Sequence, residues 1–496
     1  MNETRTLYGN RATYGPMIRY GKAEGATMPT DRRDKVDAVV VGAGLSGLAA
    51  ARRLADRGRS VIVLEALPRV GGRTLTGRVG AAVVDEGATL VYPVHDNVFR
   101  LARAHGVELF ESNAGGRFLL HTGGVTRAFR FGTPRGMGLV TRPALRPILR
   151  ASMRLAARWT TLPLPPEVIL QVLGALTALD RMAADIPAEA PWSAADAELL
   201  DQRTFGSWLR EQVPDSRARL LFEANFAGYL PESTSLLYAL HFLRTWGGLG
   251  TLLAGPARVF RFHGGAQELA QAMAVALGDR VVVASPVREI VQHPDGVTVR
   301  CAETEFEADR AILAIGPAGL RELSFDPALP ADSAALLQDW RPVHGRKINI
   351  VYAEPFWRQE GLSGSALTDI DAVPGLLDAS PPDGRVGVLA GYLPGDRGPA
   401  DPDERRRTVL SVCTDLFGSR AGFPRHYLEK SWQDEPYAFG CEGGLAVGAL
   451  TSARRLPKTS VGRVHFAGVE TADAWMGFLS GAIQAGERAA EETLAE

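Results

Sequence analysis

The sequence predicts an α/β fold that contains a parallel sheet, and three observations support this prediction. Residues 37–41 form an apolar run typical of a parallel strand that is buried on both faces. Residues 48–57 carry apolar side chains at helical spacing and end at Gly58, and residues 61–64 form a second apolar run. Strand, helix and strand in this order make one βαβ unit.

The turn between the first strand and the helix has the pattern Gly-x-Gly-x-x-Gly at Gly42, Gly44 and Gly47, with Ser46 inside it. The first glycine permits a tight turn, the second lets a pyrophosphate approach the backbone, and the third lets helix and strand pack closely. Free N–H groups at the helix N-terminus favour an anion. Glu65, which ends the second strand, is placed to accept hydrogen bonds from a ribose diol. The unit therefore predicts a Rossmann-like, dinucleotide-binding domain.

Length and composition indicate an ordinary globular protein. The 496 residues suit two or three domains, and 46% hydrophobic with 22% charged residues exclude a disordered or fibrous chain. Lys plus Arg (55) balances Asp plus Glu (56), so no basic field attracts nucleic acid. Three cysteines are too few for a disulfide framework or a four-thiolate metal site, and the nine histidines show no metal-ligand spacing. We therefore expect neither nucleic acid nor a metal as a partner.

No targeting or membrane segment is expected. Residues 1–35 make an irregular N-terminal arm without the apolar core of a signal peptide. No later run of about 18 apolar residues predicts a membrane-spanning helix. With so few cysteines, a reducing cytoplasmic location is expected.

Two further segments indicate which dinucleotide cofactor binds. Residues 69–74 place a second glycine turn, with Gly72 and Arg73, directly after the second strand. Residues 462–488 read as a strand, a turn with an acidic residue, and a helix that starts near Phe478. Both segments resemble the flavin segments of the flavin-containing amine oxidase family, the monoamine and polyamine oxidases, and the resemblance spans nearly the whole chain. It implies FAD, with the helix N-terminus stabilising negative charge on the reduced flavin, and cofactor contacts at Gly468, Glu470, Leu479 and Ala482.

The resemblance also implies a domain plan. Residues 281–290 resemble the portion that holds the adenine through a backbone group at Val287. The Rossmann-like FAD-binding domain is then assembled from three segments, 36–110, 255–322 and 437–496. Residues 111–254 and 323–436 make an α+β substrate-binding domain. Its first insertion is mostly helical by period and broken by prolines, and its second carries apolar strands at 348–352 and 386–392.

Lys347 lies directly before one of these strands and is one of only five lysines. A lysine that begins a strand commonly lays its stem along apolar surface and keeps its charge in water. Residues 345–358, however, resemble the family segment whose lysine holds a water beside flavin N5. The resemblance implies that Lys347 stabilises negative charge that develops during hydride transfer and reaction with dioxygen.

Trp432 and Cys441 lie in a segment that resembles the one carrying the cysteine bound covalently to flavin in monoamine oxidases. Two positions depart from that family pattern, because Glu442 and Phe478 replace the aromatic pair, usually tyrosines, over the flavin face. A free cysteine more often packs as a small apolar group, so we expect non-covalent FAD, with a covalent link at Cys441 as the alternative. Glu442 would attract a second cation of a diamine, or be satisfied by nearby backbone. The candidate catalytic residues are Lys347, Glu442, Trp475 and Phe478.

These features predict an FAD-dependent amine oxidase. Hydride would leave the carbon next to an amine nitrogen, the imine would hydrolyse to an aldehyde or ketone, and dioxygen would become hydrogen peroxide. The alternatives are an FAD-dependent desaturase or dehydrogenase acting on a carbon skeleton, an L-amino acid oxidase, or a non-enzymatic flavoprotein. Arginines recur every four residues from Arg142 to Arg158, as on a solvated helix face or a contact with an acidic partner. The sequence leaves open both the identity of the amine substrate and the formation of a homodimer.

Overall fold

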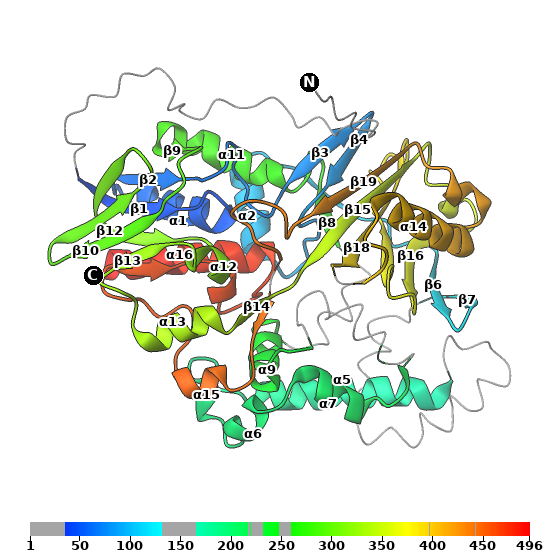
Figure 1. The fold of residues 1–496 in the computed structure, drawn as a ribbon. Coiled ribbons are helices and arrows are strands. Elements are labelled where there is room, and N and C mark those ends of the chain that lie inside the picture. The colour runs from blue at the N-terminus through cyan, green and yellow to red at the C-terminus, as the bar shows by residue number, and fades with distance from the viewer. Residues whose placement is uncertain are drawn as a thin grey trace, which may run out of the picture.

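The computed structural model of this chain describes residues 35–130, 165–216, 219, 232–247, 259–395, 397–441 and 443–496. The N-terminal arm before Lys35, the arginines at 142–158 and Glu442 lie outside the described residues. Figure 1 shows two sheets side by side, with a set of helices below them. The chain crosses between these parts several times, so each is built from segments that are distant in sequence.

The first sheet has eight strands that come from residues 36–64, 281–326 and 464–466. β1, β2, β9, β12 and β21 run parallel, whereas β10 and β11 add an antiparallel edge. The order is β13 (Ser324–Asp326), β10 (Glu289–His293), β11 (Gly296–Arg300), β12 (Glu305–Leu313), β1 (Val36–Val41), β2 (Val61–Leu64) and β9 (Val281–Val282), with β21 (Val464–Phe466) also on β12. The strands of the predicted βαβ unit therefore lie inside this sheet, between β12 and β9.

Helices pack against the central strands of this sheet. α1 (Leu45–Asp56) lies against α16 (Leu479–Ala495), and the set is completed by α2 (Asp96–Ala104) and α11 (Gln267–Leu277). A Cβ atom on Gly486 of α16 would collide with the backbone of Ser46 in α1. The C-terminal helix is thus locked onto α1, so two segments that are distant in the sequence lie side by side.

The second sheet has seven strands and corrects one expectation. Its order is β19 (His426–Ser431), β15 (Gly345–Tyr352), β18 (Gly387–Pro394), β17 (Gly375–Asp378), β16 (Leu362–Thr368), β6 (Arg117–Thr122) and β7 (Val125–Phe129). β6 and β7 fall in the insertion that was expected to be mostly helical. Gly123 and Gly124 both have positive φ (59° and 73°), as a two-residue hairpin turn requires, so the Gly-Gly pair was the missed signal. α14 (Pro402–Phe417) packs on this sheet.

The helices below the sheets share one apolar core with the C-terminal segment. They are α5 (Pro166–Ala184), α6 (Ala197–Asp201), α7 (Phe205–Gln212) and α9 (Leu236–Thr245). Residues 236–243 of α9 are all buried, and the same core contains Met476 and Phe478. Pro166 opens α5, as the proline pattern predicted.

Short elements complete the fold. They are α12 (Pro317–Leu320), α13 (Ala331–Gln338), α15 (Ala449–Ala453) and three two-stranded sheets: β3 (Thr76–Val79) with β4 (Ala82–Asp85), β5 (Leu109–Glu111) with β8 (Phe260–Phe262), and β14 (Trp340–Pro342) with β20 (Gly443–Leu445). Across the described ranges, no helix has both the length and the apolar character that crossing a membrane requires.

Candidate active site

A long cavity opens beyond the carboxyl ends of β1 and β2, where ligands bind in open α/β sheets. Its volume is about 340 Å³, within the roughly 300–1,000 Å³ of ordinary small-molecule sites. Its wall runs from the glycine turn before α1 to the start of α16. The predicted cofactor residues that line it are Gly42, Gly44, Ser46, Glu65, Gly72, Arg73, Val287, Cys441, Glu470, Leu479 and Ala482.

The three glycines of the first turn have separate physical roles. Gly42 has φ of +100°, and a Cβ there would lie 2.9 Å from the carbonyl oxygen of Ala314. Gly47 is not in the cavity wall, and a Cβ there would collide with the carbonyl oxygen of Gly42. Gly44 caps α1, and a Cβ there would meet no protein atom within 4 Å. Gly44 therefore faces open space at the helix N-terminus, where an anion is favoured.

Glu65 is buried and held by backbone N–H groups on both carboxylate oxygens. Ala43 donates to Oε2 at 2.7 Å and Leu67 donates to Oε1 at 2.9 Å. Burial raises the pKa of Glu65, while these two bonds oppose the rise. Each carboxylate oxygen has a second lone pair, so Glu65 retains acceptor capacity toward the cavity, which Val287 also lines.

Arg73 and Glu470 join the second glycine turn to the C-terminal segment. Arg73 Nη1 donates to Glu470 Oε1 at 2.8 Å, and the Glu470 side chain is only 3% exposed. Among the described residues, the other carboxylate oxygen of Glu470, Oε2, is buried and has no hydrogen-bond partner. Buried acceptors are rarely left unpaired, and FAD carries hydroxyl groups that can donate to such an oxygen. The residues present therefore fit FAD.

Two other predicted cofactor residues, Gly468 and Trp432, lie outside the cavity wall and contact the chain around it, whereas Ser46 is in the wall. Gly468 lets the C-terminal segment approach β12, since a Cβ there would lie 2.6 Å from the carbonyl oxygen of Ile315. The Trp432 indole donates to the carbonyl of Glu86 at 2.6 Å. The Ser46 hydroxyl donates to the carbonyl of Ala467.

Lys347 lies on β15 and turns toward the end of β4. Its Nζ donates to the Thr89 hydroxyl at 3.1 Å, and Thr89 adjoins Ala88 in the cavity wall. Burial lowers the pKa of Lys347, while the nearby Asp85 carboxylate acts to raise it. Sequence reasoning missed Asp85 and Thr89, although an acidic residue at the end of the apolar run 81–84 was an available signal.

The segment that carries Cys441 forms one wall of the cavity. Cys441 is partly buried, and its N–H donates to the carbonyl of Val343 at 3.0 Å. Tyr437 and Phe439 line the same wall with left-handed backbones (φ of 62° and 55°), which sequence reasoning missed. The prediction for Glu442 concerns a residue that the structure does not describe.

Of the remaining candidate catalytic residues, Phe478 lines the cavity and Trp475 does not. Phe478 caps α16, so the first N–H groups of this helix face the cavity beside Leu479 and Ala482. Trp475 packs behind it, 5.7 Å from the Phe478 ring and 4.7 Å from the buried imidazole of His95. Burial lowers the pKa of His95 to about 4, so this aromatic cluster is uncharged at neutral pH.

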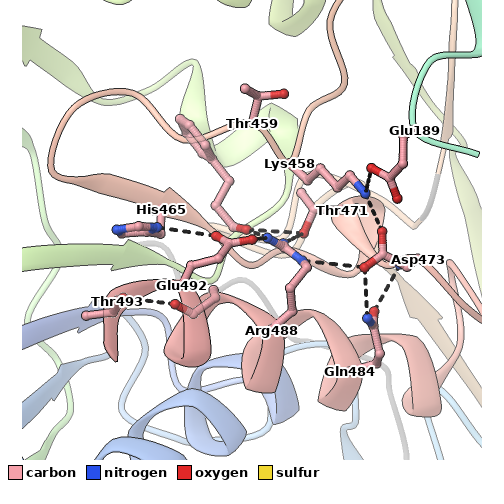
Figure 2. A network of polar contacts seen from close by, with 12 residues as sticks. Glu189, Lys458, Thr459, His465, Thr471, Asp473, Gln484, Arg488, Glu492 and Thr493 are labelled. Atoms are coloured by element: carbon pink, nitrogen blue, oxygen red, sulfur yellow. Dashed lines mark hydrogen bonds and ion pairs between the residues drawn. The ribbon is translucent and has the colours of Figure 1, made fainter. Parts of the chain in front are cut away.

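A polar network fixes the chain that leads to Phe478 (Figure 2). Asp473 pairs with Lys458, accepts from Gln484 Nε2 at 3.0 Å, and donates from its N–H to Gln484 Oε1 at 2.9 Å. Lys458 also pairs with Glu189 at 2.7 Å. Arg488 donates to the Thr471 hydroxyl at 3.0 Å. Residues 471–473 are thereby held on α16.

Comparison with known proteins identifies the family. The profile of the "flavin containing amine oxidoreductase" family matches residues 45–494. The AofH protein of Mycobacterium tuberculosis is 36% identical over 467 residues, which cover 93% of this chain and 97% of AofH. A flavin-containing amine oxidase of Danio rerio is 33% identical over 476 residues, covering 92% and 85%.

A solved structure has the same fold. Putrescine oxidase, in its wild-type form bound to putrescine, superposes with a TM-score of 0.83 at 28% identity and covers 93% of this chain and 99% of its own. The fold class, the FAD cofactor and FAD-dependent amine oxidation predicted from the sequence are confirmed. Because the family profile and these relatives extend over nearly all of its length, the chain belongs to the flavin-containing amine oxidoreductases.

Proposed function

We propose that this chain oxidises an amine to an imine and reduces dioxygen to hydrogen peroxide. The substrate loses a hydride from the carbon next to nitrogen and a proton from nitrogen, and both electrons and both protons end on dioxygen. The imine then hydrolyses to an aldehyde or ketone. The observation that carries the proposal is the cavity lined by the glycine turn and Glu65, with the buried, unpaired oxygen of Glu470 in its wall. When bound, FAD supplies the hydride acceptor.

We assign Lys347 the role of stabilising negative charge that develops during the reaction. The Thr89 hydroxyl orients its ammonium group, and the lowered pKa lets Nζ hold or release a proton closer to neutral pH than a solvated lysine does. A positive charge fixed at this place favours negative charge that develops nearby. Asp85 limits the fall in the Lys347 pKa and so preserves that charge.

The site surroundings support an uncharged reacting amine. Phe478 contributes an apolar side chain to the cavity, and the His95 beside it is neutral above about pH 4. Amines that carry no charge at the reacting nitrogen lose hydride more readily, since the lone pair assists departure. The relatives are described as acting on monoamines and on putrescine, a diamine, and Glu442 next to Cys441 is the residue we assign to a second cation.

Anaerobic mixing with a panel of monoamines, diamines and amino acids tests the function. Flavin absorbance should bleach with at least one amine, and air should restore it with one equivalent of hydrogen peroxide. Glu442→Gln should weaken apparent affinity for diamines roughly tenfold while sparing monoamines, as expected for one charge-assisted contact. Bleaching by none of the panel would refute amine oxidation, and equal effects on both amine classes would remove the role of Glu442.

We also assign the protein to the cytoplasm and propose a homodimer. Cys301, Cys413 and Cys441 form no disulfide with one another, which suits a reducing compartment. Light scattering on the holoenzyme would measure the dimer, and a monomer mass at micromolar concentration would contradict it.

A further inference from the structure

The loop from Asp473 to Phe478 has an unusual backbone at its centre. Trp475 has φ of +57°, a left-handed conformation that an aromatic residue rarely adopts. The Trp475 carbonyl accepts from the Phe478 N–H at 3.0 Å, and this closes the turn that presents Phe478 to the cavity. Such a backbone persists only where its surroundings over-determine it, so the contacts that hold it decide where Phe478 lies.

Those contacts come from the C-terminal end of α9, more than 200 residues earlier in the chain. The carbonyl of Thr245 accepts from the Trp475 N–H at 2.9 Å. The Thr245 hydroxyl accepts from the Met476 N–H at 3.3 Å, and the Trp246 indole donates to the Met476 carbonyl at 3.1 Å. The last carbonyls of a helix have no partner within the helix, and here one of them binds the loop.

Trp246 also reaches the cavity wall directly. It is 1% exposed, and its ring lies 5.1 Å from that of Phe478 in an edge-to-face arrangement. The other end of the loop is fixed by Asp473, through Lys458 and Gln484 (Figure 2). The turn is therefore held at Asp473 by Lys458 and Gln484, and at Trp475 and Met476 by the end of α9.

We propose that Thr245 and Trp246 are positioning residues for amine oxidation, which hold Trp475 left-handed and so keep Phe478 against the flavin. This inference rests on the proposed function. Neither residue lines the cavity, so Thr245 acts through the loop, and Trp246 acts through the loop and through its ring contact with Phe478. Without these bonds Trp475 would relax toward an ordinary conformation and draw Phe478 out of line, and a misplacement of about 1 Å in an active site costs up to roughly a hundredfold in rate.

Thr245→Val and Trp246→Phe test this in the holoenzyme. Thr245→Val keeps the side-chain shape and removes the hydroxyl that binds Met476 and Phe242, and Trp246→Phe replaces the indole with a smaller ring that lacks the N–H donor to Met476. We expect flavin content close to that of the wild type, altered visible circular dichroism of the bound flavin, and reduction by amine slower by roughly ten- to a hundredfold. Thr245→Ser, which keeps the hydroxyl, should restore both signals.

Arg244→Gln is the matched control, because Arg244 also extends from the end of α9 but donates to the carbonyls of Ala183 and Ala184, not to the loop. It should lower the melting temperature and leave the flavin dichroism and reduction rate unchanged. Wild-type dichroism and rate in both Thr245→Val and Trp246→Phe would overturn the proposal, as would equal slowing by Arg244→Gln. If no amine reduces the wild-type flavin, the proposed function fails, and the dichroism still decides the positioning.

Discussion

Replacing Gly44 by aspartate should abolish flavin loading without unfolding the protein. Gly44 has an ordinary extended backbone (φ −71°, ψ 176°) and caps α1, and a Cβ there meets no protein atom within 4 Å. Aspartate is a preferred N-cap residue and stabilises a helix by a few tenths of a kcal/mol relative to glycine there. The fold should therefore tolerate the substitution, and the apoprotein should melt at or slightly above the wild-type temperature.

The affinity for flavin should fall, in contrast to the stability of the apoprotein. A carboxylate at residue 44 would point into the space that the glycine turn leaves for a pyrophosphate. At a separation of about 4 Å and an effective dielectric constant of about 20, one unit of phosphate charge is repelled by about 4 kcal/mol. This energy corresponds to roughly a thousandfold weaker binding, before the steric effect is counted.

The assay compares the melting temperature of flavin-free protein with the Kd for added FAD. Gly47→Ala serves as the contrasting variant, because its Cβ would collide with the Gly42 carbonyl oxygen and force α1 away from β1. That overpacking should cost about 1–3 kcal/mol of apoprotein stability. Normal FAD binding by Gly44→Asp, or a loss of apoprotein stability as large as that of Gly47→Ala, would refute the reasoning.

Three further predictions concern single side chains. Lys347→Met, which removes the charge and keeps the stem, should slow stopped-flow reoxidation of reduced flavin by roughly ten- to a thousandfold, and an unchanged rate would leave Lys347 a structural residue. Partial burial of Glu435 raises its pKa, but hydrogen bonds from Lys430 and Arg69 lower it below 4.5 overall. Its stabilising charge is therefore present above pH 4.5 and lost as pH falls through the lower folded pKa, so the wild type should lose more stability on acidification than Glu435→Gln, and parallel stability curves would contradict this. Acid precipitation should leave yellow supernatant and protein of unmodified mass, whereas a mass increase equal to FAD would demonstrate the link at Cys441.

The parts of the site that the sequence predicted are those whose constraints are local. Gly42, Gly44 and Gly47 lie within one turn, where Gly42 has a positive φ and a Cβ on Gly47 would collide with the carbonyl of Gly42 itself. Glu65 ends a strand that pairs with β1 in the same βαβ unit. The geometry of such motifs is determined by a few adjacent residues.

The parts that the sequence did not predict depend on contacts between distant segments. Lys347 was singled out, but its partner Thr89 lies 258 residues away, on a segment placed by the two-stranded sheet of β3 and β4. Thr245 and Trp246 read as ordinary helix-end residues, because only the fold brings Trp475 and Met476 to them. The hairpin of β6 and β7 is a different case, since its Gly-Gly turn was visible and the helical period that follows in the insertion outweighed it.

The charges around the cavity bear on why flavin affinity should be sensitive to a substitution at Gly44. Arg69 and Arg73, the two arginines of the second glycine turn, are each paired with a carboxylate, at 2.6 Å to Glu435 and 2.8 Å to Glu470. Glu435 also pairs with Lys430, so the carboxylates offset only part of the cationic charge near the cavity wall. The free N–H groups and dipole at the start of α1 add positive potential where the glycine turn leaves space for a pyrophosphate. A substitution at the N-cap of that helix acts directly on this potential, which is why it should change flavin affinity by orders of magnitude and leave the fold intact.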